Sequence, residues 1–297
     1  TPVTSGVPLP AGMDIRDAGS LRLVDSGGSL VLAQFTPLAR WGAAPSDANT
    51  PLRWVLVDFQ TNLAPGEERF YFLQQAGDAA ATEKQITLTD GEDSLVIDTG
   101  AAIFSISKND GSFNAPFLQV PAVWRAVDGA GNTRLQSGPL EVTVTVDGTM
   151  RAAVTVKGTF SGEGGDYLDT TTRYWFYAGS PLVRIFYTIE NNQLCPLAEY
   201  EQPACLDIGS GGSLDVRDIS LVLQTDLGED LSYQLGIQDE PLQSGLAGSL
   251  LLYQDSSGTA YWDRYPQMVD WEGQSLDARP RMQSYSSFSG YQVTLDQ

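Results

Sequence analysis

Tyrosine, tryptophan, arginine and aspartate side chains are concentrated between residues 253 and 281. Abstraction of the proton next to a sugar carboxylate needs a base and a group that stabilises the developing negative charge. The chain has no histidine, so tyrosine, lysine and carboxylate side chains are the bases it offers. Tyr261 or Tyr265, with Arg264 beside them, would form such a pair. Polysaccharide lyase chemistry is therefore one interpretation of this cluster.

The same cluster has a second interpretation, as a sugar-binding surface without catalysis. Planar aromatic rings contact the apolar face of a pyranose while polar side chains bond to its hydroxyls. Tyr261, Trp262, Tyr265 and Trp271 would form the platform, and Arg264 would contact hydroxyls. A third interpretation is a loop whose aromatic rings pack on the domain beneath and whose Arg and Asp side chains pair on the surface. The sequence leaves the three interpretations open.

Two Arg-Trp dipeptides, Arg40-Trp41 and Arg53-Trp54, resemble catalytic pairs at first sight. They occur within segments that we predict to be strands of a barrel. Cation–π stacking and packing in the barrel core explain them without catalysis.

Side chains with the nitrogen and sulfur atoms that bind zinc are few, because the chain has two cysteines and no histidine. That inventory cannot complete a zinc site. Residues 90–93 and 128–132 are acidic and contain glycine, so they suggest calcium, but neither has the ligand spacing of an EF-hand loop. We predict no cofactor and no metal site, with calcium as the alternative.

Cys195 and Cys205 are ten positions apart, and the chain begins at Thr1 rather than at methionine. We interpret that beginning as a processed N-terminus and expect an extracellular or cell-surface protein. In an oxidising compartment the two cysteines would form a disulfide, with a free pair as the alternative. Closing this loop would contribute about 2–3 kcal/mol in the chain-entropy model.

The charge is strongly negative, with 37 acidic residues against 17 basic ones and a net charge of −20. Nucleic acids and anionic membranes attract basic surfaces, so we predict neither as a partner. No apolar run approaches the roughly 18 residues of a membrane span. Solubility outside the cell explains the charge, and cation binding is the alternative.

Hydrophobic residues alternate with period two in most segments, which predicts an all-β fold. Asp147-Gly148 lies between two alternating runs and predicts a hairpin turn, and Gly179-Ser180-Pro181 predicts a second one. The predicted strands cover residues 21–24, 52–60, 69–74, 95–99, 101–108, 140–147, 151–159, 171–177, 182–190, 216–225, 250–254 and 291–295.

Residues 75–93 change character, since an alanine run is followed by an acidic stretch that contains glycine. This change predicts a small barrel over residues 1–90 and a larger antiparallel β-sandwich over residues 91–297. Long irregular segments at 191–212 and 255–289 lie in the second domain, and such loops usually carry function or form interfaces.

Three segments carry a resemblance to a known family: Gly6-Val-Pro-Leu-Pro-Ala-Gly12, Ala33-Gln-Phe-Thr-Pro-Leu-Ala-Arg-Trp41 and Leu52-Arg-Trp-Val-Leu-Val-Asp-Phe-Gln60. They resemble the N-terminal RIFT-barrel domain of the exo-rhamnogalacturonan lyases. The family's Pro-Asp-Gly-Ser turn is replaced here by residues 42–51. Residues 99–107, 177–184, 252–258 and 288–293 are similar to the family's central β-sandwich. The α/α-toroid domain that follows in the family's enzymes is not in this sequence.

We therefore expect a non-catalytic extracellular structural protein that assembles with copies of itself. Strand addition at an exposed sheet edge would join subunits head to tail into a filament. The predicted contributors are the N-terminal segment with Val3, Val7 and Leu9, and Tyr291 in the aromatic C-terminal region. A carbohydrate-binding module and a rhamnogalacturonan-type lyase are the alternatives, with a polysaccharide or an O-glycan as partner.

Overall fold

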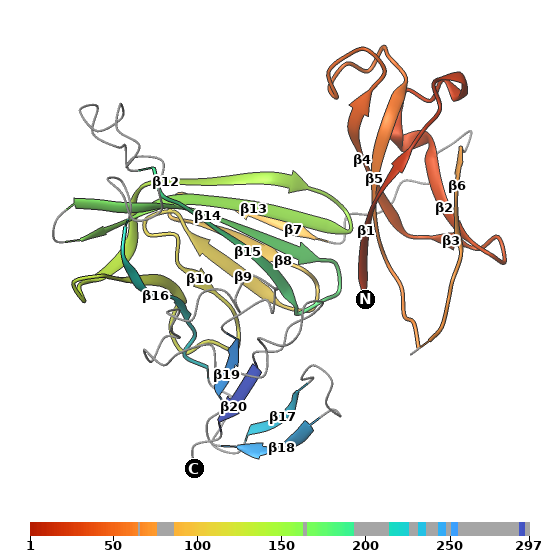
Figure 1. The fold of residues 1–297 in the computed structure, drawn as a ribbon. Helices are drawn as coiled ribbons and strands as arrows, with labels where there is room; N and C mark the ends of the chain where they lie inside the picture. The colour runs from red at the N-terminus through yellow and green to blue at the C-terminus, as the bar shows by residue number, and fades with distance from the viewer. Residues whose placement is uncertain are drawn as a thin grey trace, which may run out of the picture.

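The computed structural model of the chain describes residues 1–64, 66–75, 86–162, 165–192, 214–225, 231–235, 243–247, 251–254 and 291–294 (Figure 1). The predicted all-β fold is confirmed, because every sheet within these ranges is built from antiparallel strands. The helical elements of the described part are two single 3-10 turns, η1 (Ala11–Met13) and η2 (Ala18–Ser20). No helix in the described ranges is long and apolar enough to cross a bilayer.

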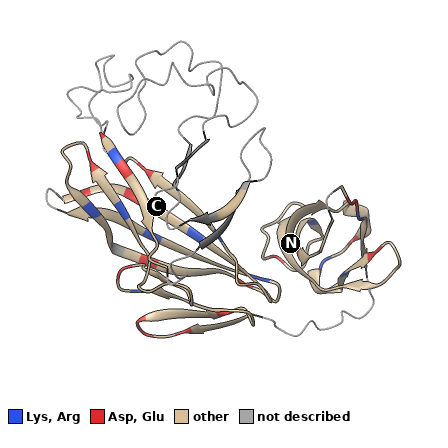
Figure 2. Cartoon of the chain, turned by 90° about the horizontal axis from the view of Figure 1, so that it is seen from below, with Lys and Arg blue, Asp and Glu red and all other residues tan. Residues whose placement is uncertain are grey.

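The N-terminal unit, residues 1–75, consists of two three-stranded sheets around one core. Sheet A has the order β1 (Pro2–Pro8), β5 (Leu52–Gln60), β4 (Ala33–Arg40), and sheet B has the order β3 (Leu30–Val31), β2 (Leu21–Asp25), β6 (Tyr71–Gln75). Aliphatic and aromatic side chains from both sheets and from the segment between β1 and β2 fill the core: Leu9, Ile15, Ala18, Leu21, Leu23, Ala33, Leu52, Val55, Val57 and Phe59. Viewed from below, the strands of this unit form a ring (Figure 2).

The second unit is a sandwich of two sheets. One has the order β10 (Phe113–Asn114), β9 (Ile103–Ser107), β8 (Ser94–Asp98), β7 (Thr87–Asp90). The larger has the order β15 (Val183–Glu190), β14 (Gly165–Tyr177), β13 (Arg151–Gly162), β12 (Thr133–Asp147), β11 (Val123–Asp128), β16 (Val216–Val222). Their facing side chains form a second core: Ile86, Leu95, Ile97, Phe104, Ile106, Phe113, Ala152, Val154, Val156, Tyr174 and Phe176.

The six-stranded sheet curls strongly on itself. Trp124 of β11 and Tyr187 of β15 belong to strands separated by three others, yet their rings stack with centroids 3.5 Å apart. Strand twist accumulates across a sheet, so wide sheets bend until distant strands approach. Burial raises the pKa of the Tyr187 hydroxyl and that of Tyr174, the latter to about 12. This stack closes the concave face over a third cluster around Phe160.

Both predicted hairpins are confirmed. The strand β12 ends at Asp147 and β13 begins at Arg151, and the chain reverses between them, starting at Gly148. The second reversal joins β14 to β15, with Gly179 at φ +63°. The remaining described strands form two small sheets, β17 (Leu231–Leu235) with β18 (Gln243–Ala247), and β19 (Leu251–Gln254) with β20 (Tyr291–Thr294).

The change of character after residue 75 falls between the two units. The strands of the N-terminal unit end at Gln75, whereas Thr87–Asp90 pairs with β8 of the sandwich. The strand β7 ends at Asp90, so it falls within the predicted first domain, although its hydrogen bonds join it to the second unit.

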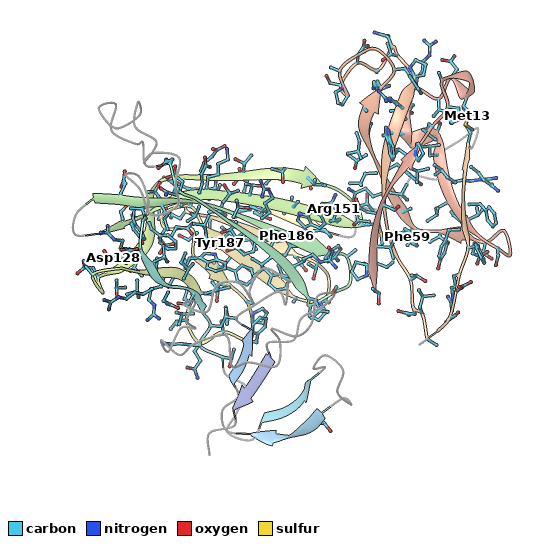
Figure 3. The ribbon with its side chains drawn as sticks, viewed as in Figure 1. Met13, Phe59, Asp128, Arg151, Phe186 and Tyr187 are labelled. Carbon is cyan, nitrogen blue, oxygen red and sulfur yellow. The ribbon has the colours of Figure 1, made fainter. Side chains whose placement is uncertain are left out.

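A buried ion pair joins the two units. Arg151 Nε of β13 donates to Asp58 Oδ1 of β5 at 2.8 Å, and the two side chains are 4% and 3% exposed. Thr4 Oγ1 donates to the same carboxylate oxygen at 2.6 Å, and the Arg151 guanidinium lies 4.5 Å over the ring of Trp175. Arg151 lies at the end of the sandwich nearest the N-terminal unit, and Asp128 at the opposite end (Figure 3).

The Gln34 side chain of β4 also joins the two units, because it is hydrogen-bonded to the backbone of the second one. Its Oε1 accepts hydrogen bonds from the backbone N–H groups of Met150 and Arg151, both at 3.0 Å. A Cβ added at Gly148 would collide with the Gln34 side chain. The glycine that sequence patterns assign to the hairpin turn therefore also allows the close approach of the two units.

Candidate functional site

A groove of about 670 Å³ opens at the end of the N-terminal unit. Its volume falls within the range of pockets that hold small organic ligands. Its lining comes from the turn after β2, the end of β5 and the segment leading into β6: Asp25, Ser26, Val31, Gln60, Thr61, Asn62, Glu67, Glu68, Arg69, Phe70 and Tyr71. Nearly all of these side chains carry a polar group or an aromatic ring.

Local hydrogen bonds fix two walls of the groove. Asp25 Oδ1 accepts from the backbone N–H groups of Gly27 and Ser29 at 2.9 and 2.8 Å, which holds the tight turn between β2 and β3. Across the groove the Thr61 and Tyr71 hydroxyls are 2.5 Å apart, and the Tyr71 ring packs on Phe59. These walls are therefore preorganised by the fold of the unit.

Among the described residues that line the groove, the one cation is already paired. Arg69 Nε lies 2.5 Å from Glu67 Oε1. The backbone N–H of Ala64 and the Arg69 guanidinium hold the pKa of Glu67 below its usual range, and Glu67 raises the pKa of Arg69. Both groups stay charged at neutral pH and neutralise each other.

Other groups in the groove remain available to a ligand. Ser26, Asn62 and Glu68 form no hydrogen bond with any described residue. Phe70 is 67% exposed, which is unusual for a phenylalanine. A planar apolar ring beside unengaged hydroxyl, amide and carboxylate groups is an arrangement that can bind a polyhydroxylated molecule.

A smaller cavity of about 290 Å³ lies beside the groove at the joint between the units. Val31 and Gln60 line both spaces, and Leu32, Met150, Ala178 and Gly179 complete the smaller one. Gln60 Nε2 donates to the carbonyl oxygen of Ala178 at 2.5 Å. The groove therefore borders the second unit through a side chain that is hydrogen-bonded to it.

The residues predicted to bind sugar lie outside the described ranges, so their arrangement stays a prediction. This applies to Tyr261, Trp262, Arg264, Tyr265 and Trp271, and also to the predicted disulfide between Cys195 and Cys205. Tyr291 lies in β20, opposite Gln254 of β19.

The predicted assembly residues of the N-terminal segment have partners within the chain. Val3 and Val7 of β1 pack on the core of the N-terminal unit, and Leu9 is part of that core. Sequence reasoning placed this segment at a subunit contact, whereas the structure makes it a strand of its own unit. Self-assembly itself remains a prediction.

The outer edge of β1 offers few hydrogen-bond donors to another strand. Thr1 exchanges both backbone hydrogen bonds with Thr61, so in an antiparallel ladder the even-numbered residues of β1 point their backbone groups away from β5. Two of those four residues, Pro2 and Pro8, have no N–H. Pro37 lies in the same outward phase on β4, the opposite edge of sheet A. Prolines at such positions oppose strand addition.

The two Arg-Trp dipeptides have structural partners. Arg40 is buried and donates to the carbonyl oxygens of Arg16, Pro45 and Thr50. The Arg53 guanidinium lies 5.0 Å over the ring of Trp41, which confirms the predicted cation–π stacking. The prediction that these residues pack in the barrel core is wrong for the two indole rings, because Trp41 and Trp54 are 41% and 38% exposed on the outer surface.

The two acidic turns considered for calcium are held by protein donors. Asp128 accepts hydrogen bonds from the backbone of Ala130 and Asn132 and from the side chains of Asn132 and Arg134. Asp90 of the other turn pairs with Lys108 at 2.6 Å. Within the described ranges no cluster of three or more cysteine or acidic side chains has the geometry of a metal site.

The groove was not predicted from the sequence. Its residues come from three separate segments, and none of them forms a motif along the chain. The one feature of the sequence that could have indicated the groove is the run of residues 67–71, where three charged residues precede two aromatic ones at the start of a strand. No protein-family model matches the chain, and a search of curated proteins finds no match.

Proposed function

We propose that this protein is a non-catalytic, extracellular carbohydrate-binding protein whose groove on the N-terminal unit holds a short oligosaccharide. One observation carries the proposal, namely the exposed Phe70 ring beside the unengaged groups of Ser26, Asn62 and Glu68. A pyranose has an apolar face that would contact the ring, and hydroxyls that would bond to the polar groups.

Two further points support binding over catalysis in this groove. Glu67 is held ionised by Ala64 and Arg69, so it is a poor proton acceptor. Tyr71 is engaged by Thr61 and Phe59. The resemblance to the N-terminal part of polysaccharide lyases favours the same ligand class.

The first prediction tests this proposal. A panel of neutral, amine-bearing and uronate oligosaccharides is screened, and the affinity of each bound glycan is measured by titration calorimetry. Phe70→Ala is expected to weaken binding by about five- to tenfold, because a ring stacking contact is worth roughly 1 to 1.4 kcal/mol.

Phe72→Ala is the matched control for that experiment. Phe72 is 52% exposed and lies two residues further along, but it does not line the groove. Its replacement should leave the affinity unchanged. Binding of no glycan by the parent protein would refute the function, and equal affinity of the parent and Phe70→Ala would remove the groove from it.

A second candidate function is self-assembly, favoured by the outer face of sheet B. On this face the apolar side chains of Leu30 and Phe72 lie on either side of Val24, which is itself buried, and the Arg22–Gln74 hydrogen bonds flank them. Leu30 and Phe72 are 57% and 52% exposed. The five residues include no carboxylate in a chain that carries 37, so they add no like-charge repulsion of their own between two copies. A second copy is therefore the partner that this face would accept.

A further inference from the structure

Resting on the proposed carbohydrate-binding function, we propose that the groove selects neutral or amine-bearing oligosaccharides and rejects polyuronates. The proposal concerns the ligand class of this groove, and it follows from how its charges are paired. It differs from the substrate that the resemblance to rhamnogalacturonan lyases implies, because that polysaccharide contains uronic acid.

The groove carries an uncompensated negative charge. Three carboxylates, those of Asp25, Glu67 and Glu68, line it together with one guanidinium, that of Arg69. These groups leave a net charge of −2. Since Arg69 is bound to Glu67, the unbalanced carboxylates are those of Asp25 and Glu68.

A uronate carboxylate would find no unpaired cation among the lining residues. It would have to share Arg69 with Glu67, which lies 2.5 Å from the guanidinium nitrogen and stays ionised at neutral pH. It would at the same time enter the field of Asp25 and Glu68, and like charges at short range repel. Every further uronate residue in the groove would add to that repulsion.

A neutral or amine-bearing sugar has complementary partners in the same groove. Its hydroxyls would bond to the Ser26 hydroxyl and the Asn62 amide, and its apolar face would lie on Phe70. Glu68 would accept hydrogen bonds from hydroxyls, and it would bind an ammonium group with the added strength of a charge-assisted hydrogen bond. We therefore expect amine-bearing sugars to bind at least as tightly as neutral ones at low salt.

The test compares four tetrasaccharide probes by titration calorimetry on the full chain. The probes are β-1,4-galactotetraose, the β-1,4-glucosamine tetramer, α-1,4-tetragalacturonate and its methyl ester, which differs from the acid only in charge and the added methyl groups. At low salt the acid is expected to bind about tenfold more weakly than the ester. At physiological salt, where the Debye length falls to about 8 Å, that ratio should shrink.

Glu68→Gln is the charge-removing variant, and Glu92→Gln, an exposed acid on the hairpin between β7 and β8, is its control. Only Glu68→Gln should reduce the ratio of ester to acid affinity. An acid that binds as tightly as its ester at low salt would overturn the selectivity while leaving carbohydrate binding intact. Absence of binding by all four probes, and by the panel described above, would overturn the proposed function and the selectivity together.

Discussion

Two buried arginines of this chain are satisfied in different ways. Arg40 donates to three backbone carbonyl oxygens, whereas Arg151 has a carboxylate partner in Asp58 and an aromatic ring in Trp175. Asp58 Oδ2 has no hydrogen-bond partner, so the ion pair uses one of its two oxygens. Buried pairs of this kind specify how two surfaces meet, because breaking them leaves a charge without solvent or partner.

The second prediction concerns that pair. Asp58→Ala would leave the Arg151 guanidinium buried without a counter-ion, so the free energy of unfolding should fall by about 3–5 kcal/mol. Urea denaturation followed by circular dichroism measures the change. Glu141→Gln, which removes the charge from the exposed Glu141–Lys157 pair, should change it by less than about 1 kcal/mol. Similar values for the two variants would contradict the structural role of the joint.

The third prediction concerns Asp128, at the far end of the sandwich. Hydrogen bonds from the backbone and side chain of Asn132 and from Arg134 lower the pKa of Asp128 to about 2. An aspartate of an unfolded chain titrates near 3.9, so the stabilisation is complete above that pH and is lost as the pH falls towards 2. The Tm difference between the parent and Asp128→Asn should therefore shrink across this interval. A constant difference would mean that the carboxylate charge contributes nothing.

At the scale of elements, the residues of β1 alternate between those whose backbone groups bond to β5 and those whose backbone groups point outward. A substitution that removes an N–H is therefore expected to destabilise the protein only at the first kind. The odd-numbered residues exchange backbone hydrogen bonds with β5, so the N–H of Ser5 is part of the ladder while its side chain is exposed. The even-numbered residues leave their backbone groups outside. A variant that lacks residues 1–8 would lose the whole of β1, so it would report on the folding of the N-terminal unit rather than on assembly.

The fourth prediction tests that phase. Ser5→Pro removes a ladder donor and leaves its acceptor on β5 without a partner, so it should lower the free energy of unfolding by about 1–3 kcal/mol. Ser5→Ala keeps the N–H and should remain close to the parent. The measurement is thermal or urea unfolding of the three proteins. A proline tolerated at position 5 would show that the strand is shifted by one residue or is absent in solution.

The sequence predicts much of the sandwich and less of the N-terminal unit. Alternation gives β8, β9, β13 and both hairpins. One face of β8 and of β9 is more deeply buried than the other, whereas β13 is buried on both faces and was recognised from the spacing of its valines. Alternation does not give β1 or β4, since Pro2, Pro8 and Pro37 interrupt the pattern. The resemblance indicated a strand over residues 33–41 but none over residues 2–8. The structure shows that these prolines are compatible with strands because their missing N–H groups would face outward.

The groove escaped prediction for a related reason. Its polar side chains belong to turns and strand ends, whose positions depend on how sheets A and B pack. Nothing along the chain distinguishes Asn62 or Glu68 from the solvated residues of an ordinary loop. Fold class follows from local periodicity, whereas a site built from three separate segments follows from tertiary structure alone.

At the scale of the whole molecule, net charge and the apolar face of sheet B oppose each other. Acidic residues lie on both units (Figure 2). A charge of −20 keeps copies apart at low salt, and screening shortens the range of that repulsion at higher salt. Any association through the apolar face should therefore strengthen as salt is added, which is the opposite of what contacts between oppositely charged surfaces would do.

The fifth prediction follows from this opposition. Sedimentation velocity at rising protein and salt concentrations should show association of the parent, and Phe72→Glu should abolish it by placing a carboxylate on the apolar face. Leu182→Glu, at an apolar side chain that is 70% exposed elsewhere, should associate like the parent. A parent that stays monomeric throughout would remove the self-assembly candidate and leave carbohydrate binding.

The ion pair between the two units also has a consequence for the order in which parts of the protein fold. Asp58 and Arg151 are 93 positions apart, and the strands of the N-terminal unit are complete at Gln75. During synthesis, domains generally fold in order from the N-terminus. The first unit can thus close while Asp58 is still hydrated, and its carboxylate loses water only when the β12–β13 hairpin emerges from the ribosome and delivers Arg151. Docking of the two units is then a late step, set by the arrival of one side chain.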